Sequence, residues 1–551
     1  MEKFDTIVIG SGAGGLATAL CLARSGQKVL VLEQHYVPGG WCHTFTLNSQ
    51  RFSPGVHYIG LLDEGQSTNE LYKGLGIAND LTFFRMNKKG YDHCIIGNQK
   101  FDLPAGIDNL QNKLIAAFPK EEKNIKAYLS LIQKVNYELQ LMPKLKGLWQ
   151  KITVPFRTKH FGKYALFSLQ RVIGWHIKDP LLQAILNSQC GDHGVSPAHA
   201  CFPVHCSVMN HYFDGGFYPM GGGSSIVKAM TNKIKSFNGE IRISQNVSKI
   251  IVENNQAKGV VLTTGETLLA NTIVSNADPS ITYLKLIGEE NLSKKLNKKL
   301  AKTKYSVTSL IMFLTVELDV TKYGIDSGNI WKFKDENIDA HFASLTEGNI
   351  SEGDTFPALF ISCTTLKDPV SFNGKYHNFE VVTYVNYDSF KDFEYKADYH
   401  TEAYEQFKKK IIEKFLNNME ELIPNLKNHI VQVELGTPKT NQFYINSTNG
   451  NVYGTHKTLN QVGPFSFKYK SEIENLYLCG ASTLSHGVAG ATYSGLAAAA
   501  QILNCTSDDL LIKDDSQKIK IFDAEDSATW SDFVHKKRED KIRNFKEIAL
   551  S

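Results

Sequence analysis

The first 33 residues carry a pattern typical of a nucleotide-binding α/β fold. An apolar run at Phe4–Ile9 predicts a buried strand, and a segment of small and apolar residues at Leu16–Ser25 predicts a helix. Between them lies Gly10-Ser11-Gly12-Ala13-Gly14-Gly15, which fits G-x-G-x-x-G with glycines at 10, 12 and 15. Gly10 and Gly12 let the backbone turn tightly and approach a pyrophosphate, while Gly15 lets the helix pack on the strand.

An acidic residue completes this pattern. Gly26 ends the predicted helix, and a second predicted strand at Lys28–Leu32 leads directly to Glu33. Glu33 lies about 20 residues beyond the glycines, where a carboxylate can accept hydrogen bonds from a ribose diol. The order strand, glycine turn, helix, strand and acid therefore predicts a dinucleotide site, with Gln34 beside it.

The next segment narrows the choice of dinucleotide. Gly39-Gly40 follows the acid closely, then Trp41-Cys42-His43-Thr44-Phe45, and then Gly55-Val56-His57-Tyr58. A nicotinamide-binding domain has no obvious need for a glycine pair at this point. Gly221-Gly222-Gly223 has the wrong spacing for a second fingerprint, so we expect no separate nicotinamide domain.

On these residues the chain resembles the phytoene desaturase superfamily of FAD-dependent oxidoreductases, and most closely its retinol saturase and carotenoid isomerase branch, through GGWCHTF and GVHYIG. Relatives also carry blocks similar to 216–222, 274–278, 475–481 and 486–491, so the resemblance extends from residue 4 to about 503. Trp41 departs from the pattern, because many relatives have arginine after the glycine pair.

The resemblance implies an α/β fold, with a Rossmann-like FAD-binding domain of the amine oxidase or carotenoid desaturase type and an inserted α+β substrate domain. We expect the FAD-binding domain at 1–65, 212–290 and 465–510, the substrate domain at 66–211 and 291–464, and a C-terminal tail at 511–551. The flavin contacts that it implies are Gly10, Ser11, Gly12, Ala13, Gly14, Gly15, Glu33, Gln34, Gly39, Gly40, Trp41, His43, Thr44, Val247, Gly480, Val488, Ala489 and Ala491.

Three residues are candidates for proton transfer because they lie in segments expected to reach the flavin. They are His57, Tyr58 and His486, with His57 the first choice, and His43 follows the glycine pair directly. Each could instead be structural, bonding the backbone or a flavin phosphate. Asp192-His193-Gly194 is similar to a turn in retinol saturase-like chains and is expected near the substrate.

The resemblance implies chemistry on a carbon–carbon double bond of a polyene or isoprenoid lipid, such as 13,14-reduction of all-trans-retinol. Alternatives are a carotenoid desaturase, a cis–trans isomerase, or a flavin-bound lipid escort without catalysis. The electron donor or acceptor is unidentified. The net charge of +4 and the lack of a recognisable binding module argue against nucleic acid.

Cysteine and histidine usage does not predict a metal site. The nine cysteines contain no C-x-x-C pair, which suggests a reducing compartment. Six His and Cys residues cluster between 193 and 211, but their spacing does not match H-x-x-x-H or C-x-x-C, so we favour core or pocket-lining roles. The six are His193, His199, Cys201, His205, Cys206 and His211.

Residues 144–178 contain eight Lys or Arg and no Asp or Glu, with aromatic residues interleaved. Such a stretch suits the headgroup zone of an anionic membrane, although it could also be a solvated basic helix pair whose aromatic residues face the core. The first predicted strand begins at residue 4 without a signal peptide, and no apolar run reaches 18 residues. We therefore expect a peripheral membrane protein on the cytoplasmic face.

Periodicity predicts further elements. Helical spacing is present at Leu110–Lys134 and Thr401–Met419, and strands are expected at Ser306–Leu318 and Asn378–Tyr387. Four short strands are expected at Glu240–Ile243, Val247–Glu253, Ala257–Thr263 and Leu268–Val274. The tail carries a weakly amphipathic, mixed-charge helical pattern from Trp530 to Ile548.

Overall fold

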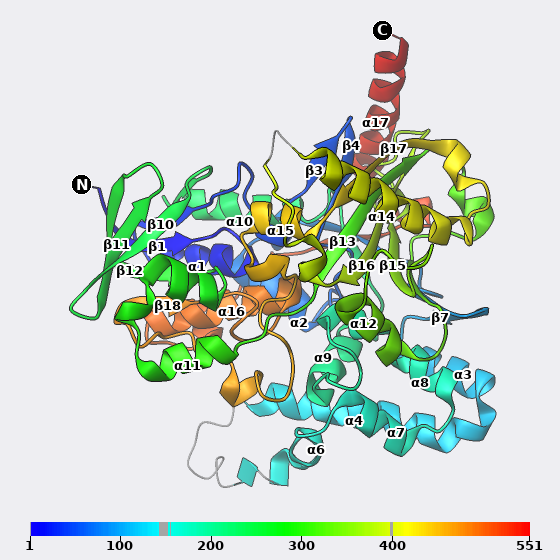
Figure 1. Ribbon diagram of the computed structural model, residues 1–551, viewed down its shortest axis with the longest axis horizontal. Helices are drawn as coiled ribbons and strands as arrows, with labels where there is room; N and C mark the ends of the chain where they lie inside the picture. Colours follow the sequence, from blue (N-terminus) through cyan, green and yellow to red (C-terminus); the bar gives the residue numbers. More distant parts are fainter. Residues whose placement is uncertain (1, 143–152, 155, 397–399, 551) are drawn as a thin grey trace.

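The computed structural model describes residues 2–142, 153–154, 156–396 and 400–550. One part of the molecule is built on a seven-stranded sheet with α1 and α16 packed beside it, and a second part is built on another seven-stranded sheet (Figure 1). A group of helices lies below this second sheet in the same view. No helix in the described ranges is both long and apolar enough to cross a bilayer.

The first sheet has a parallel core in the order β9-β2-β1-β12-β18. β12 is extended at its start by the antiparallel pair β11 and β10, and at its end it pairs with β18. Its strands come from three separate stretches of the chain. They are β1 (Lys3–Ile9), β2 (Val29–Leu32), β9 (Glu240–Arg242), β10 (Val247–Glu253), β11 (Gln256–Leu262), β12 (Thr267–Ser275) and β18 (Leu476–Leu478).

Three helices cover this sheet: α1 (Ala13–Arg24), α10 (Ser224–Ser236) and α16 (Gly487–Ile502), with α1 packed between the other two. Small residues allow α1 and α16 to approach closely, because a Cβ on Gly495 would lie 2.1 Å from the Gly14 carbonyl oxygen. Thr18 Oγ1 donates to the Gly495 carbonyl oxygen at 3.0 Å across the same contact. The N-terminal glycine turn is thereby held against a helix about 480 residues later in the chain.

The second sheet is antiparallel except where β14 runs parallel to β6. β13, which lies between β17 and β16, is buried at every position, as its apolar sequence predicted. In order, the strands are β17 (Ile430–Gly436), β13 (Thr308–Val316), β16 (His377–Val385), β15 (Ala358–Cys363), β14 (Asn329–Phe333), β6 (Asp92–Ile96) and β7 (Gln99–Leu103). The associated helices are α12 (Ile338–Glu347), α13 (Thr364–Lys367), α14 (Glu402–Glu420) and α15 (Pro438–Ile445).

The helices below the second sheet differ from the sequence prediction at Pro119. The single helix expected over Leu110–Lys134 is wrong, because α3 (Ile107–Ala117) ends before Pro119 and α4 (Glu122–Leu141) begins after it. Proline cannot supply the backbone N–H that a continuous helix requires. The remaining helices of this group are α6 (Lys159–Tyr164), α7 (Leu169–His176), α8 (Pro180–Asn187) and α9 (Phe202–Tyr212).

The C-terminal segment is integrated into the fold rather than hanging free. β19 (Lys520–Asp523) pairs in parallel with β5 (Thr82–Arg85), which pairs in turn with β8 (Phe217–Pro219). The last helix, α17 (Asp532–Leu550), extends away from the body at the C-terminus (Figure 1). The other elements are α2 (Ser67–Leu75), α11 (Lys294–Lys302), and the hairpin of β3 (Phe45–Leu47) and β4 (Gln50–Phe52).

Candidate active site

The glycine turn lies at the carboxyl end of β1, and Asn276, which follows β12, packs against it. Gly10 has φ +92°, a conformation that favours glycine. A Cβ on Gly12 would lie 2.6 Å from Asn276 Nδ2, and one on Gly15 would lie 2.1 Å from the Gly10 carbonyl oxygen. No side chain caps the first turn of α1, so its N–H groups are available to an anion.

Glu33 is buried at the end of β2, with 6% of its surface exposed. Its Oε2 accepts hydrogen bonds from the Ser11 backbone N–H at 2.9 Å and the Ser11 hydroxyl at 2.6 Å, and its Oε1 accepts one from the His35 N–H at 2.9 Å. A carboxylate has about four acceptor positions, so these bonds leave capacity for a ribose hydroxyl. Glu33 therefore braces the glycine turn and still faces the cavity described below.

The Gly39-Gly40 pair closes over the glycine turn. A Cβ on Gly40 would lie 3.2 Å from the Cα of Gly12, and the Gly39 N–H donates to the Ser11 hydroxyl at 2.9 Å. Gly39 has φ +127° and Gly40 has φ +54°. Both the backbone conformation and the close approach therefore require small residues at these two positions.

One cavity runs from this turn to the second sheet and encloses about 1780 Å³ of empty space, open solvent included. Its near wall is the carboxyl edge of the first sheet, and its far wall is formed by apolar and aromatic side chains of β13 to β16. The far-wall residues are Ile311, Trp331, Phe360, Val382 and Tyr384. Of the residues expected to meet the flavin or act on protons, those that line the cavity are Gly10, Gly12, Ala13, Gly14, Glu33, Gln34, Gly39, Gly40, Trp41, His57, Val247, Gly480, Val488 and Ala491.

The remaining expected residues lie behind this wall. His43 Nδ1 donates to the Gly40 carbonyl oxygen at 2.7 Å, and burial lowers the pKa of His43 to about 4. Thr44 Oγ1 donates to the Ser224 hydroxyl at 2.8 Å. These two residues support the glycine pair through side-chain bonds. The other expected residues outside the cavity lining are Ser11, Gly15, Tyr58, His486 and Ala489.

His57 faces the cavity and is held from behind by buried charged groups. Its Nδ1 donates to Glu380 Oε2 at 3.0 Å, and the Glu380 side chain is fully buried. Lys367 is also fully buried, and its Nζ donates to the His57 carbonyl oxygen at 2.9 Å and to the Ser362 hydroxyl at 2.7 Å. Burial lowers the pKa of Lys367 to about 7, against the attraction of nearby Glu380 and Asp92.

Tyr58 lies one layer deeper and joins two aspartates. Its hydroxyl lies 2.6 Å from Asp192 Oδ2 and 3.2 Å from Asp92 Oδ2, and its ring stacks on Tyr212 at a centroid distance of 4.0 Å. Asp92 is fully buried on β6, whereas Asp192 lines the cavity. Burial raises the pKa of Asp92 to about 6 and that of Asp192 to about 8.

The resemblance predicts that the Asp192 turn lies near the substrate, but no motif indicates Asp192 itself as a proton-transfer group, and none indicates Asp92, Lys367 or Glu380. The only available signal was the Asp-His-Gly turn itself, because the partners lie on β6, α13 and β16, far apart in the chain. His486 is linked to the same turn, since its Nε2 donates to the Asp192 carbonyl oxygen at 2.8 Å.

The histidines between 193 and 211 have individual partners. His193 Nε2 lies 3.4 Å from His205 Nδ1, His199 bonds to Ser196, and His211 Nε2 accepts the Gly60 N–H at 2.8 Å. Across the residues that the structure describes, no group of three or more His, Cys, Asp or Glu side chains could hold a metal ion.

Comparison with known proteins agrees with this arrangement. Residues 13–503 match the family described as flavin containing amine oxidoreductase. The chain is 30% identical to the all-trans-retinol 13,14-reductase of Danio rerio over 527 residues, covering 91% of this chain and 86% of that protein. It is 25% identical to prolycopene isomerase 1 of an Oncidium hybrid cultivar, covering 91% and 84%. An oxidoreductase structure from Methanosarcina mazei shares the fold with a TM-score of 0.60 at 17% identity, covering 91% of this chain and all of that one.

Proposed function

The chain belongs to the family of flavin-containing amine oxidoreductases, and from this membership we propose that it reduces a carbon–carbon double bond of a polyene lipid, in the manner of its all-trans-retinol 13,14-reductase relatives. The protein is a flavoenzyme and its cofactor is FAD. Bound FAD supplies or accepts a hydride, which is the two-electron half of such a reaction.

The residues around the glycine turn fit this cofactor. Gly12 and Gly14 line the cavity, and the uncapped start of α1 offers N–H groups to a pyrophosphate. We assign ribose binding to Glu33 and contact with the adenine side to Val247. The flavin side is assigned to the glycine pair, to Trp41 and to the residues that line the cavity near α16: Gly480, Val488 and Ala491.

One observation carries the choice of substrate class. The cavity continues past the dinucleotide end into an apolar chamber walled by Ile311, Trp331, Phe360 and Val382. Trp331 and Phe360 meet edge to face, with ring centroids 4.6 Å apart. A flat, apolar conjugated chain suits such walls.

The test is the mass of the product. Chemically reduced holoenzyme incubated anaerobically with all-trans-retinol is expected to yield a product heavier by two hydrogens. An unchanged mass with a shifted retention time would instead identify a cis–trans isomerase, which the prolycopene isomerase relatives make the second candidate. No conversion of retinol or of longer carotenoids, by reduced or oxidised enzyme, would contradict both and favour a flavin-bound escort.

Three residues are proposed to handle protons or to position groups that do. His57 can meet the substrate directly because it lines the cavity. Tyr58 acts through Asp192, and His486 holds the backbone of the Asp192 turn. Conversion of a double bond also requires that water be kept from the reacting carbons, and the aromatic walls serve that purpose.

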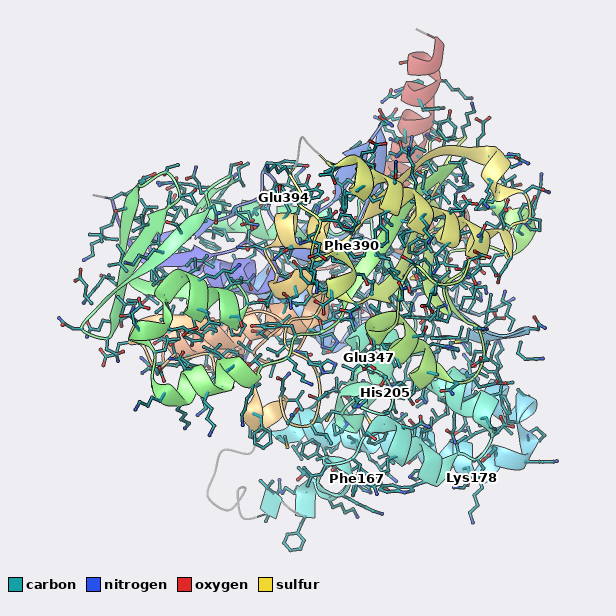
Figure 2. The ribbon with its side chains drawn as sticks, viewed as in Figure 1. Phe167, Lys178, His205, Glu347, Phe390 and Glu394 are labelled. Carbon is teal, nitrogen blue, oxygen red and sulfur yellow. The ribbon has the colours of Figure 1, made fainter. Side chains whose placement is uncertain are left out.

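We further propose that the underside of the helical group contacts an anionic membrane, from which a lipid substrate is drawn. Residues 143–152 and 155 of the basic stretch lie outside the described residues. Phe156, Leu166 and Trp175 are 82%, 76% and 48% exposed. Tyr164 is buried and packs inward, so the aromatic residues divide between the core and the surface. Phe167 and Lys178 mark this side of the molecule in Figure 2.

Changing Lys159, Lys163 and Arg171 to glutamine is expected to reduce binding to anionic vesicles, because each basic residue near such a surface contributes about 1 kcal/mol and the three together roughly a hundredfold in partitioning. Sedimentation with vesicles containing phosphatidylserine measures the effect. The matched control changes Lys294, Lys295 and Lys298 on α11 in the same way, with the same loss of charge. Equal sedimentation of both triple variants would contradict a specific contact at the helical group.

A further inference from the structure

The hydroxyl of Tyr58 lies between two carboxyl groups and cannot serve both of them as a donor. Its oxygen is 2.6 Å from Asp192 Oδ2 and 3.2 Å from Asp92 Oδ2. A phenol has one hydrogen, whereas two ionised carboxylates are acceptors only. The arrangement is therefore satisfied only if one of the two aspartates carries a proton and donates to the Tyr58 oxygen.

The partners of the two aspartates show which one carries it. Asp92 accepts hydrogen bonds from Asn329 Nδ2 and Gln189 Nε2, both at 2.8 Å, which favours its ionised form. Lys367 Nζ donates to Asn329 Oδ1, and this contact orients the amide so that its NH₂ group faces Asp92. For the carboxyl group of Asp192, Tyr58 is the one hydrogen-bond partner found in the described part of the chain.

We propose that Asp192 is the general acid of the double-bond reduction, delivering a proton from its carboxyl group to the substrate carbon that faces it across the cavity. This assignment rests on the proposed function. Under this assignment, Tyr58 is a positioning residue that donates to Asp92 and accepts from Asp192. Asp92 is held ionised by two amides and keeps Tyr58 in that orientation.

In this reaction one carbon of the double bond gains a hydride, which reduced FAD would supply when bound, and the other carbon gains the Asp192 proton. Before the step the Asp192 hydrogen bonds to Tyr58, so it must first turn from Tyr58 toward the cavity. The O–H bond of Asp192 then breaks as the second C–H bond forms, and the two π electrons of the substrate become that bond. Asp192 is left as a carboxylate, toward which Tyr58 can turn its hydrogen, and it regains a proton from water when the product leaves the cavity.

The electrostatic surroundings of Asp192 agree with this role. Burial and the charge of Asp92 raise the pKa of Asp192 to about 8, whereas the charge of Lys367 lowers it. Asp192 is therefore protonated at neutral pH, as a general acid requires. The titratable groups around it are Tyr58, Tyr91, Asp92, Cys190, Tyr212, Lys367, Tyr384, Tyr453 and His486.

The first experiment uses infrared spectroscopy of the oxidised holoenzyme at pH 7, which requires no turnover. The wild-type protein is expected to show the carbonyl stretch of a protonated carboxylic acid, and Asp192→Asn is expected to lose that band while keeping full flavin content. Asp214→Asn, which changes a half-buried carboxyl group on the surface beside Gln66, is the matched control and should keep the band. Persistence of the same band in Asp192→Asn would overturn the proposal.

The second experiment follows reduction of all-trans-retinol as a function of pH. Asp192→Asn is expected to lower kcat by roughly 10²- to 10⁴-fold, the usual contribution of a general acid. The alkaline limb of the rate profile should move to lower pH in Asp92→Asn, because the charge of Asp92 raises the pKa of Asp192. A limb that stays fixed in this variant would contradict the assignment.

The two experiments separate two kinds of failure. Wild-type rates in Asp192→Asn would overturn the general-acid role and leave the proposed function intact. A wild-type enzyme that shows the infrared band but leaves every polyene unchanged would overturn the proposed function, and with it the catalytic role of a proton that is nevertheless present on Asp192.

Discussion

Changing Gly15 to alanine is expected to abolish FAD retention and to destabilise the fold. The added methyl group would lie 2.1 Å from the Gly10 carbonyl oxygen and 3.3 Å from Asn276 Cβ. The first contact is with backbone, so no side-chain movement can relieve it, and α1 must move away from β1. Overpacking typically costs about 1–3 kcal/mol, and the displaced helix start no longer faces the pyrophosphate. The purified variant should carry under roughly a tenth of the wild-type flavin.

The measurements are the ratio of flavin to protein absorbance after gel filtration and the melting temperature with and without added FAD. Gly174→Ala on α7 is the matched control, because an added Cβ there meets nothing within 4 Å. That substitution should keep full flavin content and leave stability unchanged or slightly higher. Gly15→Ala protein with a full complement of flavin would contradict the packing role of this glycine.

Mild acid is expected to unfold the protein. Burial lowers the pKa of seven histidines far below the ordinary value of about 6.5. Above that pH, both the folded and the unfolded chain hold these histidines neutral. Below it, only the unfolded chain takes up the protons, so stability falls as the pH drops from about 6.5 toward 4. The seven are His43, His193, His205, His211, His377, His456 and His486.

Some other groups reduce this loss of stability at low pH or do not contribute to it. Asp92 and Asp192 hold protons in the folded state that the unfolded chain lacks above about pH 4, so they offset about two of the seven. The pKa of His93 is raised to about 9, and its contribution is already complete below about pH 6.5. A net uptake of about five protons, halved for screening and relaxation, costs about 3 kcal/mol per pH unit, against a total stability of about 5–15 kcal/mol.

The melting temperature of the holoprotein, followed by circular dichroism between pH 7.5 and 4.5, measures this effect, and its slope gives the number of protons taken up. His211→Gln keeps an acceptor for the Gly60 N–H but cannot titrate, so it should lower the uptake by about one proton. A melting temperature that does not change from pH 7 to pH 5 would show that these histidines ionise within the fold.

Local sequence was sufficient for the nucleotide end of the cavity. The order of strand, glycine turn, helix and acid occupies fewer than 40 consecutive residues, and each glycine meets a steric requirement within that stretch or against it. Gly10 needs positive φ, Gly15 must clear Gly10, and Glu33 bonds to Ser11. The conformation of such a turn can be predicted from the local sequence, because the residues that determine it are adjacent in the chain.

The periodicity of apolar residues was sufficient to predict two buried strands and one long helix. It gave a wrong prediction where a proline interrupts a helical pattern. β13, β16 and α14 lie within two residues of their expected bounds. The helix expected over Leu110–Lys134 is interrupted at Pro119, which the apolar spacing on either side conceals. The strand β19 was also missed, because its pairing partner β5 lies more than 400 residues earlier in the chain.

The sequence alone located the glycine turn, because that turn is built from contiguous backbone, and the resemblance of its motifs predicted that the dinucleotide is a flavin. Only the tertiary structure decided which group can deliver a proton. Asp92, Asp192, Lys367 and Glu380 come from β6, the turn before α9, α13 and β16, and none of them has a recognisable motif for this task. The proton affinity of a carboxyl group depends on burial and on neighbouring charges, and the fold supplies both from residues far apart in the chain.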